Sequence, residues 1–362
     1  MKNLPEKEKS ETGNFWLAAA VCAGAIVATT VINKRRNSFS FAGKTVLITG
    51  GSRGLGLVMA REFAKEKAKI AICARNGADL ERARMDLKER GAEVAAIVCD
   101  VRDQEQVNQM IEAVRNRFGQ IDVLINNAGV IQVGPLEEQT QEDFENAMAV
   151  HYWAAYYTMS AVLPEMQARR EGRIVNITSI GAKIAVPHLT PYCASKFAVA
   201  GLSSAIQAEV YKDGVYVTTV YPGLMRTGSH INAFFKGQNE KEFAWFSISN
   251  ALPVSSVSAE HAAQSIIESC RRGDAEKIIS PQAAFAIKLN GIFPELVSTM
   301  TGLVNQFILP APGGIGDRKA RGLESTSYVS PSFLTTQLDK ASAKNNELKP
   351  GEQLNNFQLG NQ

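Results

Sequence analysis

The sequence is short of cysteine and histidine. Its 362 residues include four histidines and five scattered cysteines, at positions 22, 73, 99, 193 and 270. No Cys-x-x-Cys pair or Cys/His cluster occurs, so we expect no metal site. An odd, dispersed set of cysteines is also unlike a disulfide framework, which favours a reducing compartment.

The sequence also has little excess charge of either sign. Its net charge is +3, from 39 basic and 36 acidic residues, and no basic cluster with interleaved aromatics appears in the body of the chain. Nucleic acid is therefore not an expected partner. Hydrophobic content of 45% is ordinary for a folded protein, and the length allows one large or two ordinary domains.

Long uncharged runs are rare, but one follows the polar N-terminus (residues 1–14). Residues 15–32 contain no charge and are followed by Lys34-Arg35-Arg36. As a helix the run spans ~27 Å, close to the hydrocarbon thickness of a bilayer. We predict a single-pass transmembrane helix that leaves the body of the protein in the cytoplasm. A cleaved signal peptide, with a mature N-terminus near residue 33, and a buried or interfacial helix remain as alternatives.

Short apolar runs alternate with helical periodicity from Lys44 onward. This alternation predicts an α/β fold with a parallel, doubly wound Rossmann sheet over residues 40–282. Strands are expected at 44–48, 68–74, 93–99, 123–125, 173–177, 215–220 and 275–280. Such sheets bind ligands at the carboxyl ends of their strands.

A glycine-rich turn joins the first predicted strand to its helix. Its glycines allow the backbone to approach a pyrophosphate, and the helix N-terminus supplies free N–H groups. We predict that it binds a dinucleotide through six residues: Gly50, Ser52, Arg53, Gly54, Leu55 and Gly56.

The second strand ends in a cation. Arg75 stands 19 residues after Gly56, near the place where NAD-binding units carry an acid for the ribose 2′-hydroxyl. With Arg53 it suits a 2′-phosphate, so the sequence favours NADP(H). The alternative is that either arginine is simply solvated.

Later strand ends supply further candidate cofactor contacts. Asp100-Val101 is placed to touch adenine, and Asn127-Ala128-Gly129 to present backbone along the cofactor. Pro222-Gly223 turns the chain over the site, and Thr227 is placed to hydrogen-bond a carboxamide.

Tyr192 and Lys196 lie four residues apart on a predicted helix, so they share one face. A nearby ammonium lowers the pKa of a tyrosine from about 10 and allows it to exchange a proton near neutral pH. Ser179 ends the preceding strand and can bind the same substrate oxygen. The set suits carbonyl/alcohol redox chemistry, with a proton at oxygen and a hydride at carbon.

Taken in order, these motifs resemble the short-chain dehydrogenase/reductase family. The match covers about residues 40–281 and rests on TGGSRGLG at 49–56, Asp100, NNAG at 126–129, Ser179, YCASK at 192–196 and PGLMRT at 222–227. The resemblance implies that Tyr192 is the acid/base, that Ser179 positions the substrate oxygen, and that Lys196 binds the nicotinamide ribose. It also implies a homo-oligomer through the helices around 141–163 and 190–211.

One position departs from the family pattern. The family commonly has an asparagine in the helix before the serine strand, where it supports a relay water beside the lysine. Here the matching residue is His151. Imidazole also donates and accepts protons near neutrality, so we expect His151 to replace the asparagine and the site to be catalytically active. The alternative is that His151 is a buried histidine whose hydrogen bonds are satisfied within the core.

Three segments follow the predicted core. Residues 228–252 cover the substrate by family analogy, and their aromatics suggest a lipophilic substrate or packing against the protein or membrane. Residues 283–310 are apolar but interrupted, which predicts helices on the domain or on a bilayer surface. Residues 311–362 have few large apolar groups and predict a mostly disordered tail.

The sequence therefore predicts a membrane-tethered, NADP(H)-dependent oxidoreductase that interconverts an alcohol and a carbonyl of a small, lipophilic molecule. The alternative is a catalytically weak nucleotide-binding scaffold or redox-sensing protein.

Overall fold

A seven-stranded parallel sheet forms the centre of the protein. The computed structural model describes residues 39–252, 256–332 and 335–352. The strand order is β11-β7-β6-β4-β1-β2-β3, and it reverses between β1 and β4, which is where such sheets bind ligands. The predicted doubly wound sheet is confirmed. Its strands are β1 (Thr45–Thr49), β2 (Lys69–Ala74), β3 (Val94–Val98), β4 (Val123–Asn126), β6 (Gly172–Ile177), β7 (Val215–Tyr221) and β11 (Glu276–Ile278).

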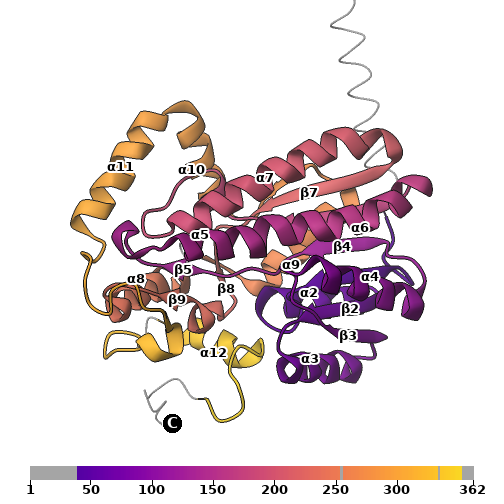
Figure 1. Cartoon of the computed structure of the whole chain (residues 1–362), viewed down its shortest axis with the longest axis horizontal. Helices are drawn as coiled ribbons and strands as arrows, with labels where there is room; N and C mark the ends of the chain where they lie inside the picture. Colours follow the sequence, from indigo (N-terminus) through magenta and orange to yellow (C-terminus); the bar gives the residue numbers. More distant parts are fainter. Residues whose placement is uncertain (1–38, 253–255, 333–334, 353–362) are drawn as a thin grey trace, which may run out of the picture.

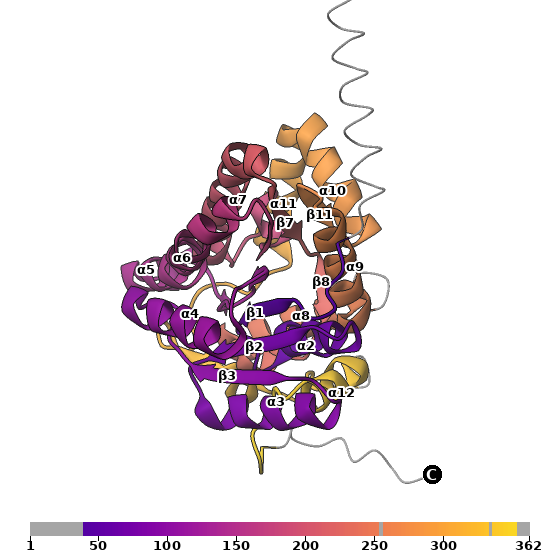
Figure 2. The same cartoon turned by 90° about the vertical axis from the view of Figure 1, so that its right-hand side faces the viewer.

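Helices cover both faces of this sheet, as Figures 1 and 2 show. The strands are short apolar runs because both faces are buried. One face carries α2 (Gly54–Lys65), α3 (Gly77–Glu89) and α9 (Ala259–Arg272). The other carries α4 (Gln104–Phe118), α5 (Gln141–Met148), α6 (Ala154–Ala168) and α7 (Thr190–Val210).

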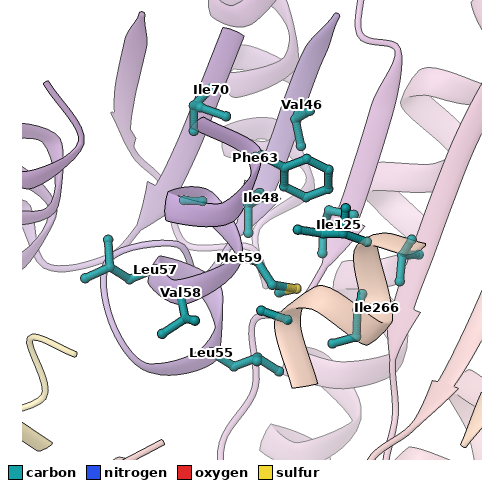
Figure 3. Packing of buried hydrophobic residues seen from close by; sticks show 14 of the residues in the cluster. Val46, Ile48, Leu55, Leu57, Val58, Met59, Phe63, Ile70, Ile125 and Ile266 are labelled. Carbon is teal, nitrogen blue, oxygen red and sulfur yellow. The ribbon is translucent and has the colours of Figure 1, made fainter. Parts of the chain in front are cut away.

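The position of α2 is fixed by apolar packing. Met59 and Phe63 of this helix are fully buried in one cluster with Ile48 of β1 and Ile266 of α9 (Figure 3). Burial of a side chain of this size stabilises the fold by about 1.5–3 kcal/mol. This packing therefore fixes the position of the first turn of α2, which follows the glycine turn.

The helix predicted at 141–163 is interrupted. After α5, residues Ala149–Trp153 form a π-helical turn before α6 continues. A π turn inserts one residue into the helical repeat, and such turns often occur at functional sites. Here it contains His151, which is buried.

Smaller elements lie beside the carboxyl edge of the sheet. β8 (Leu224–Arg226) pairs with β10 (Ser256–Ser258), and β9 (Phe234–Phe235) pairs with β5 (Gln132–Val133). The helix α8 (Asn239–Ala251) follows β9, and α10 (Pro281–Ile292) and α11 (Pro294–Phe307) form an antiparallel pair after β11. None of the helices in the described ranges is long and apolar enough to cross a membrane; the predicted span at 15–32 lies outside them.

The segment after residue 310 differs from the prediction of a disordered tail. Residues 311–332 and 335–352 are built into the fold. β12 (Ala320–Arg321) adds an antiparallel edge to β9, and α12 (Thr336–Lys344) buries Leu338. Polar side chains also join this segment to the rest of the domain, among them Asn345 with Arg61 and Asn346 with Arg82, so its low apolar content does not prevent it from folding. Residues 353–362 lie outside the described part.

Candidate active site

Ser179, Tyr192 and Lys196 meet at the carboxyl edge of the sheet. Ser179 follows β6 and accepts a 3.0 Å hydrogen bond from the Gly181 amide. Tyr192 and Lys196 lie one turn apart near the start of α7, and the Lys196 Nζ atom is 5.6 Å from the centre of the tyrosine ring. The structure therefore brings together the three residues that the sequence singled out.

Lys196 is a buried amine. Its side chain reaches back towards the sheet, where Nζ donates a 2.9 Å hydrogen bond to the Ile177 carbonyl. The residue is only 5% exposed, and burial lowers its pKa from 10.5 to about 7. The amine is thus poised to change its charge close to neutral pH.

Tyr192 differs from the sequence expectation in this structure. Burial raises the pKa of its phenol to about 12, although a hydrogen bond with Ser179 opposes that shift. The sequence analysis expected Lys196 to lower the pKa of Tyr192. That effect does not decide the result here, because the amine is itself desolvated and bonded to a backbone carbonyl. The phenol consequently holds its proton at neutral pH.

His151 has both ring nitrogens occupied. Its Nε2 atom accepts a 3.1 Å hydrogen bond from the Val130 amide, so Nδ1 carries the proton and donates to Ser195 Oγ at 2.7 Å. Burial and the nearby Lys196 hold the pKa of the imidazole well below its usual value. The ring is therefore neutral and does not titrate near pH 7. It lies within the site, but its geometry is that of a satisfied buried histidine.

A small cavity lies between His151 and Lys196. Its volume of about 10 Å³ matches a single water. Asn126, the first residue of the NNAG motif, and Asn176 also line it, and the sequence analysis predicted neither of them as a site residue. Asn126 Nδ2 donates to Asn176 Oδ1 at 2.8 Å, and Asn176 Nδ2 donates to Ser203 Oγ at 2.9 Å. The sequence does contain a signal for Asn176, because an asparagine within a largely apolar strand such as β6 needs a buried polar partner.

The glycine turn has the geometry of a phosphate-binding loop. Gly50 and Gly54 have φ angles of +65° and +55°, which favour glycine. A Cβ atom on Gly56 would lie 2.2 Å from the Gly50 carbonyl oxygen, so no other residue fits there. Asn127 Nδ2 donates to the Thr49 and Gly50 carbonyls and holds the turn against the end of β4.

The other predicted cofactor residues lie along the same edge. Arg75 is exposed at the end of β2, and Arg53 is partly exposed in the glycine turn. Arg102 pairs with Asp100 and helps to lower the pKa of its carboxyl group. Leu55 lies in the first turn of α2, and the remaining members sit at or just beyond strand ends: Ser52, Val101, Ala128, Gly129, Pro222, Gly223 and Thr227. This edge combines the glycine turn, a helix N-terminus and adjacent cations. These features together fit a phosphate-bearing dinucleotide.

Comparison with known proteins identifies the family. The sequence model of the family described as short chain dehydrogenase matches residues 44–236, which is more than half of the chain. The chain belongs to this family. A dehydrogenase/reductase SDR family protein 7-like from Anopheles gambiae is 32% identical over 294 residues, covering 78% of this chain and 91% of that protein. Gluconate 5-dehydrogenase from Gluconobacter oxydans is 34% identical over 189 residues, covering 52% of this chain and 74% of that enzyme.

Solved structures agree with this assignment. L-Sorbose reductase from Gluconobacter frateurii, complexed with NADPH and L-sorbose, is 30% identical with a TM-score of 0.61; the match covers 67% of this chain and 97% of that one. A short-chain dehydrogenase from Streptomyces avermitilis is 26% identical with a TM-score of 0.62, covering 73% and 98%. As a short-chain dehydrogenase, the protein is an oxidoreductase that acts on alcohol and carbonyl groups with a nicotinamide cofactor.

The buried amine predicts a pH-dependent difference in stability. Between pH 7 and 10.5 the unfolded chain binds a proton at Lys196 that the folded chain does not. The free energy of unfolding should therefore rise with pH, by up to about 1.4 kcal/mol per unit. Lys196→Met removes this titration. Urea denaturation from pH 6.5 to about 9.5 should show the unaltered protein gaining stability over the variant as pH rises; parallel curves would contradict the burial argument.

Proposed function

We propose that the protein is an NADP(H)-dependent oxidoreductase that interconverts an alcohol and a carbonyl of an apolar small molecule. The observation that carries this proposal is the convergence of Ser179, Tyr192 and Lys196 beside the glycine turn, at the switch point of the sheet. The nicotinamide, when bound, supplies or takes the hydride.

Tyr192 and Ser179 handle the oxygen atom of the substrate. A phenol with a pKa of about 12 is protonated at neutral pH and serves as the proton donor when a carbonyl is reduced. The Ser179 hydroxyl donates a hydrogen bond to the same oxygen and orients it. Lys196 in its charged form stabilises the phenolate that remains.

His151 acts on the site by positioning. Its two hydrogen bonds join the Val130 amide, next to the NNAG turn, to Ser195 on α7. It thereby holds the helix that carries Tyr192 and Lys196 against the cofactor edge. The water-sized cavity between its ring and Lys196 offers a route for replacing the proton that Tyr192 gives up.

The proposed preference for NADP(H) rests on charge. Arg53 and Arg75 follow the first and second strands, and guanidinium groups bind a 2′-phosphate in two-point contacts. The solved L-sorbose reductase that resembles this chain holds NADPH.

The proposed apolar substrate is supported by the wall beside Tyr192. Phe235, Phe243 and Phe246 pack in one cluster and are buried, so these aromatics lie behind the wall and do not form its surface. Ile131, Val186, Tyr192 and Trp245 are the partly buried members of the same cluster. They present an apolar surface next to the reacting phenol.

We further propose that the protein attaches to a membrane, with its catalytic domain in the cytoplasm. The apolar run at 15–32 lies outside the described residues, but the α10–α11 pair gives independent support. It exposes Phe285, Ile292, Phe293, Leu296, Met300, Leu303, Phe307 and Ile308 by 49–72% each. Exposed apolar patches on this scale are characteristic of interaction sites. The pair projects from the body at the left of Figure 1.

Tyr192→Phe tests the proposed proton transfer. The substitution keeps the ring but removes the proton donor, so kcat/KM for carbonyl reduction should fall roughly 10²- to 10⁴-fold while NADPH binding is kept. Stopped-flow or steady-state NADPH oxidation measures it. Tyr211→Phe, at the exposed far end of α7, is the matched control and should retain activity. A Tyr192→Phe variant that reduces the carbonyl as fast as the unaltered protein would contradict the role of Tyr192 as the proton donor.

Arg75→Ala tests the cofactor preference. Losing charge-assisted hydrogen bonds to a 2′-phosphate should weaken NADPH binding by roughly 10- to 100-fold and leave NADH binding nearly unchanged. Fluorescence titration with both nucleotides measures the two dissociation constants. Arg84→Ala, which removes an ion pair with Glu81 and a contact with Met85 Sδ, both on α3, is the control. Equal losses for both nucleotides would contradict a specific role in 2′-phosphate binding.

Membrane attachment is tested by flotation of the full chain with phospholipid vesicles. The unaltered protein should rise with the vesicles. Ile26→Asp places a charge in the apolar run, at a cost of about 2.5–3.5 kcal/mol in a spanning helix, and should reduce flotation. Phe285→Ser with Phe307→Ser removes two exposed aromatics and should reduce it further. A full chain that stays at the bottom of the gradient would rule out attachment.

A further inference from the structure

The C-terminal segment crosses the mouth of the glycine turn. Figures 1 and 2 show α12, in yellow, beside α8 in one view and close to α2 and α3 in the other. The three residues that follow this helix, Asn345, Asn346 and Glu347, are the ones that reach the turn. The hydrogen bond from Asn346 to the Ser52 carbonyl joins residues that lie 294 positions apart in the sequence.

Two asparagines fasten the segment to the cofactor edge. The Asn345 carbonyl accepts a 2.9 Å hydrogen bond from the Gly54 amide, and its side chain donates to the Thr227 carbonyl at 3.1 Å. Asn346 has a φ angle of +59°, which asparagine tolerates better than most residues. Its side-chain nitrogen donates to the Ser52 and Asp79 carbonyls at 2.8 and 2.9 Å.

Glu347 places a carboxylate directly on the turn. The residue is 3% exposed. Its Oε2 atom lies 3.4 Å from Arg53 Nε and accepts a 2.7 Å hydrogen bond from Asn232 Nδ2. A Cβ atom on Gly54 would come within 2.5 Å of Oε1, so the carboxylate rests against the backbone at the start of α2.

These contacts use the groups that a dinucleotide phosphate needs. The Gly54 amide belongs to the first turn of α2, which has neither an acidic residue nor a side-chain cap; such a helix end attracts anions. Arg53 is one of the two cations proposed for the 2′-phosphate, together with Arg75. A second anion brought to the same place would be repelled by the Glu347 carboxylate and would find the Gly54 N–H already bonded.

We propose that Glu347 is an internal competitor for the cofactor phosphates, and that residues 345–347 form a latch that must leave the glycine turn before the dinucleotide binds. The inference rests on the proposed NADP(H)-dependent function. The latch is held mainly by polar contacts: Arg61 with Asn345, Arg82 with Asn346, and Lys344 with Glu260. Water can replace contacts of this kind, so release costs less than exposing a core helix.

Glu347→Gln in the full chain tests the competition. The amide keeps the size of the side chain and its hydrogen bond from Asn232 but removes the charge. NADPH should bind roughly tenfold more tightly to this variant, a change typical of coupling between two ligands. Glu352→Gln is the matched control, since Glu352 pairs with Arg321 and the Lys349 amide and not with the glycine turn.

Hydrogen exchange provides a second readout. If the latch leaves, amides at 342–349 should exchange faster after NADPH is added. Slower exchange there, or equal NADPH affinity in the Glu347→Gln variant and the unaltered chain, would overturn the latch and leave the proposed function intact. A gain in affinity for NADH as large as that for NADPH supports the latch but contradicts the 2′-phosphate preference. Failure of every variant to bind either nucleotide would overturn both.

Discussion

The burial of one amine governs the chemistry of this site. Lys196 is placed by the fourth-residue spacing from Tyr192 on α7 and is held by the Ile177 carbonyl at the end of β6. A solvated lysine would be charged at all physiological pH values. Desolvation lowers its pKa to about 7, and the same desolvation raises the pKa of Tyr192 to about 12. The two shifts together leave a protonated phenol beside an amine that changes charge easily.

A buried polar network keeps these groups in place. Asn126, Asn176, Ser203 and Thr219 link β4, β6, α7 and β7 through side-chain hydrogen bonds of 2.6–2.9 Å. Buried polar groups are costly unless each finds a partner, and a satisfied network specifies one arrangement of its strands and helices. Apolar packing alone would tolerate small shifts of α7 along the sheet. The network ties the helix that carries the reacting groups to the strands beneath it.

The parts that were predicted from the sequence depend on local rules. The alternation of apolar strands and helices gave the parallel sheet, and the motif spacing gave Ser179, Tyr192 and Lys196. Two features could not be derived from the sequence, for a common reason. The role of His151 depends on what its two nitrogens contact, namely Val130 and Ser195, and a single sequence does not show these partners. The C-terminal segment was expected to be disordered because it has few large apolar residues, whereas its asparagines bond to backbone far away in the chain.

Arg53 links the C-terminal segment to the proposed cofactor site. This guanidinium lies within 4.0 Å of Asp79 and 3.4 Å from Glu347, so its charge is shared between two carboxylates. Burial raises the pKa of Glu347 and outweighs the opposing effect of Arg53, because a buried carboxylate loses its solvation. A phosphate carries more charge and more acceptor oxygens than a carboxylate, and the amides of a helix N-terminus favour it. The proposed phosphate site at the start of α2 is therefore occupied by the Glu347 carboxylate, which binds such a site less strongly than a phosphate. The affinity of the site for the cofactor depends on how readily that carboxylate leaves.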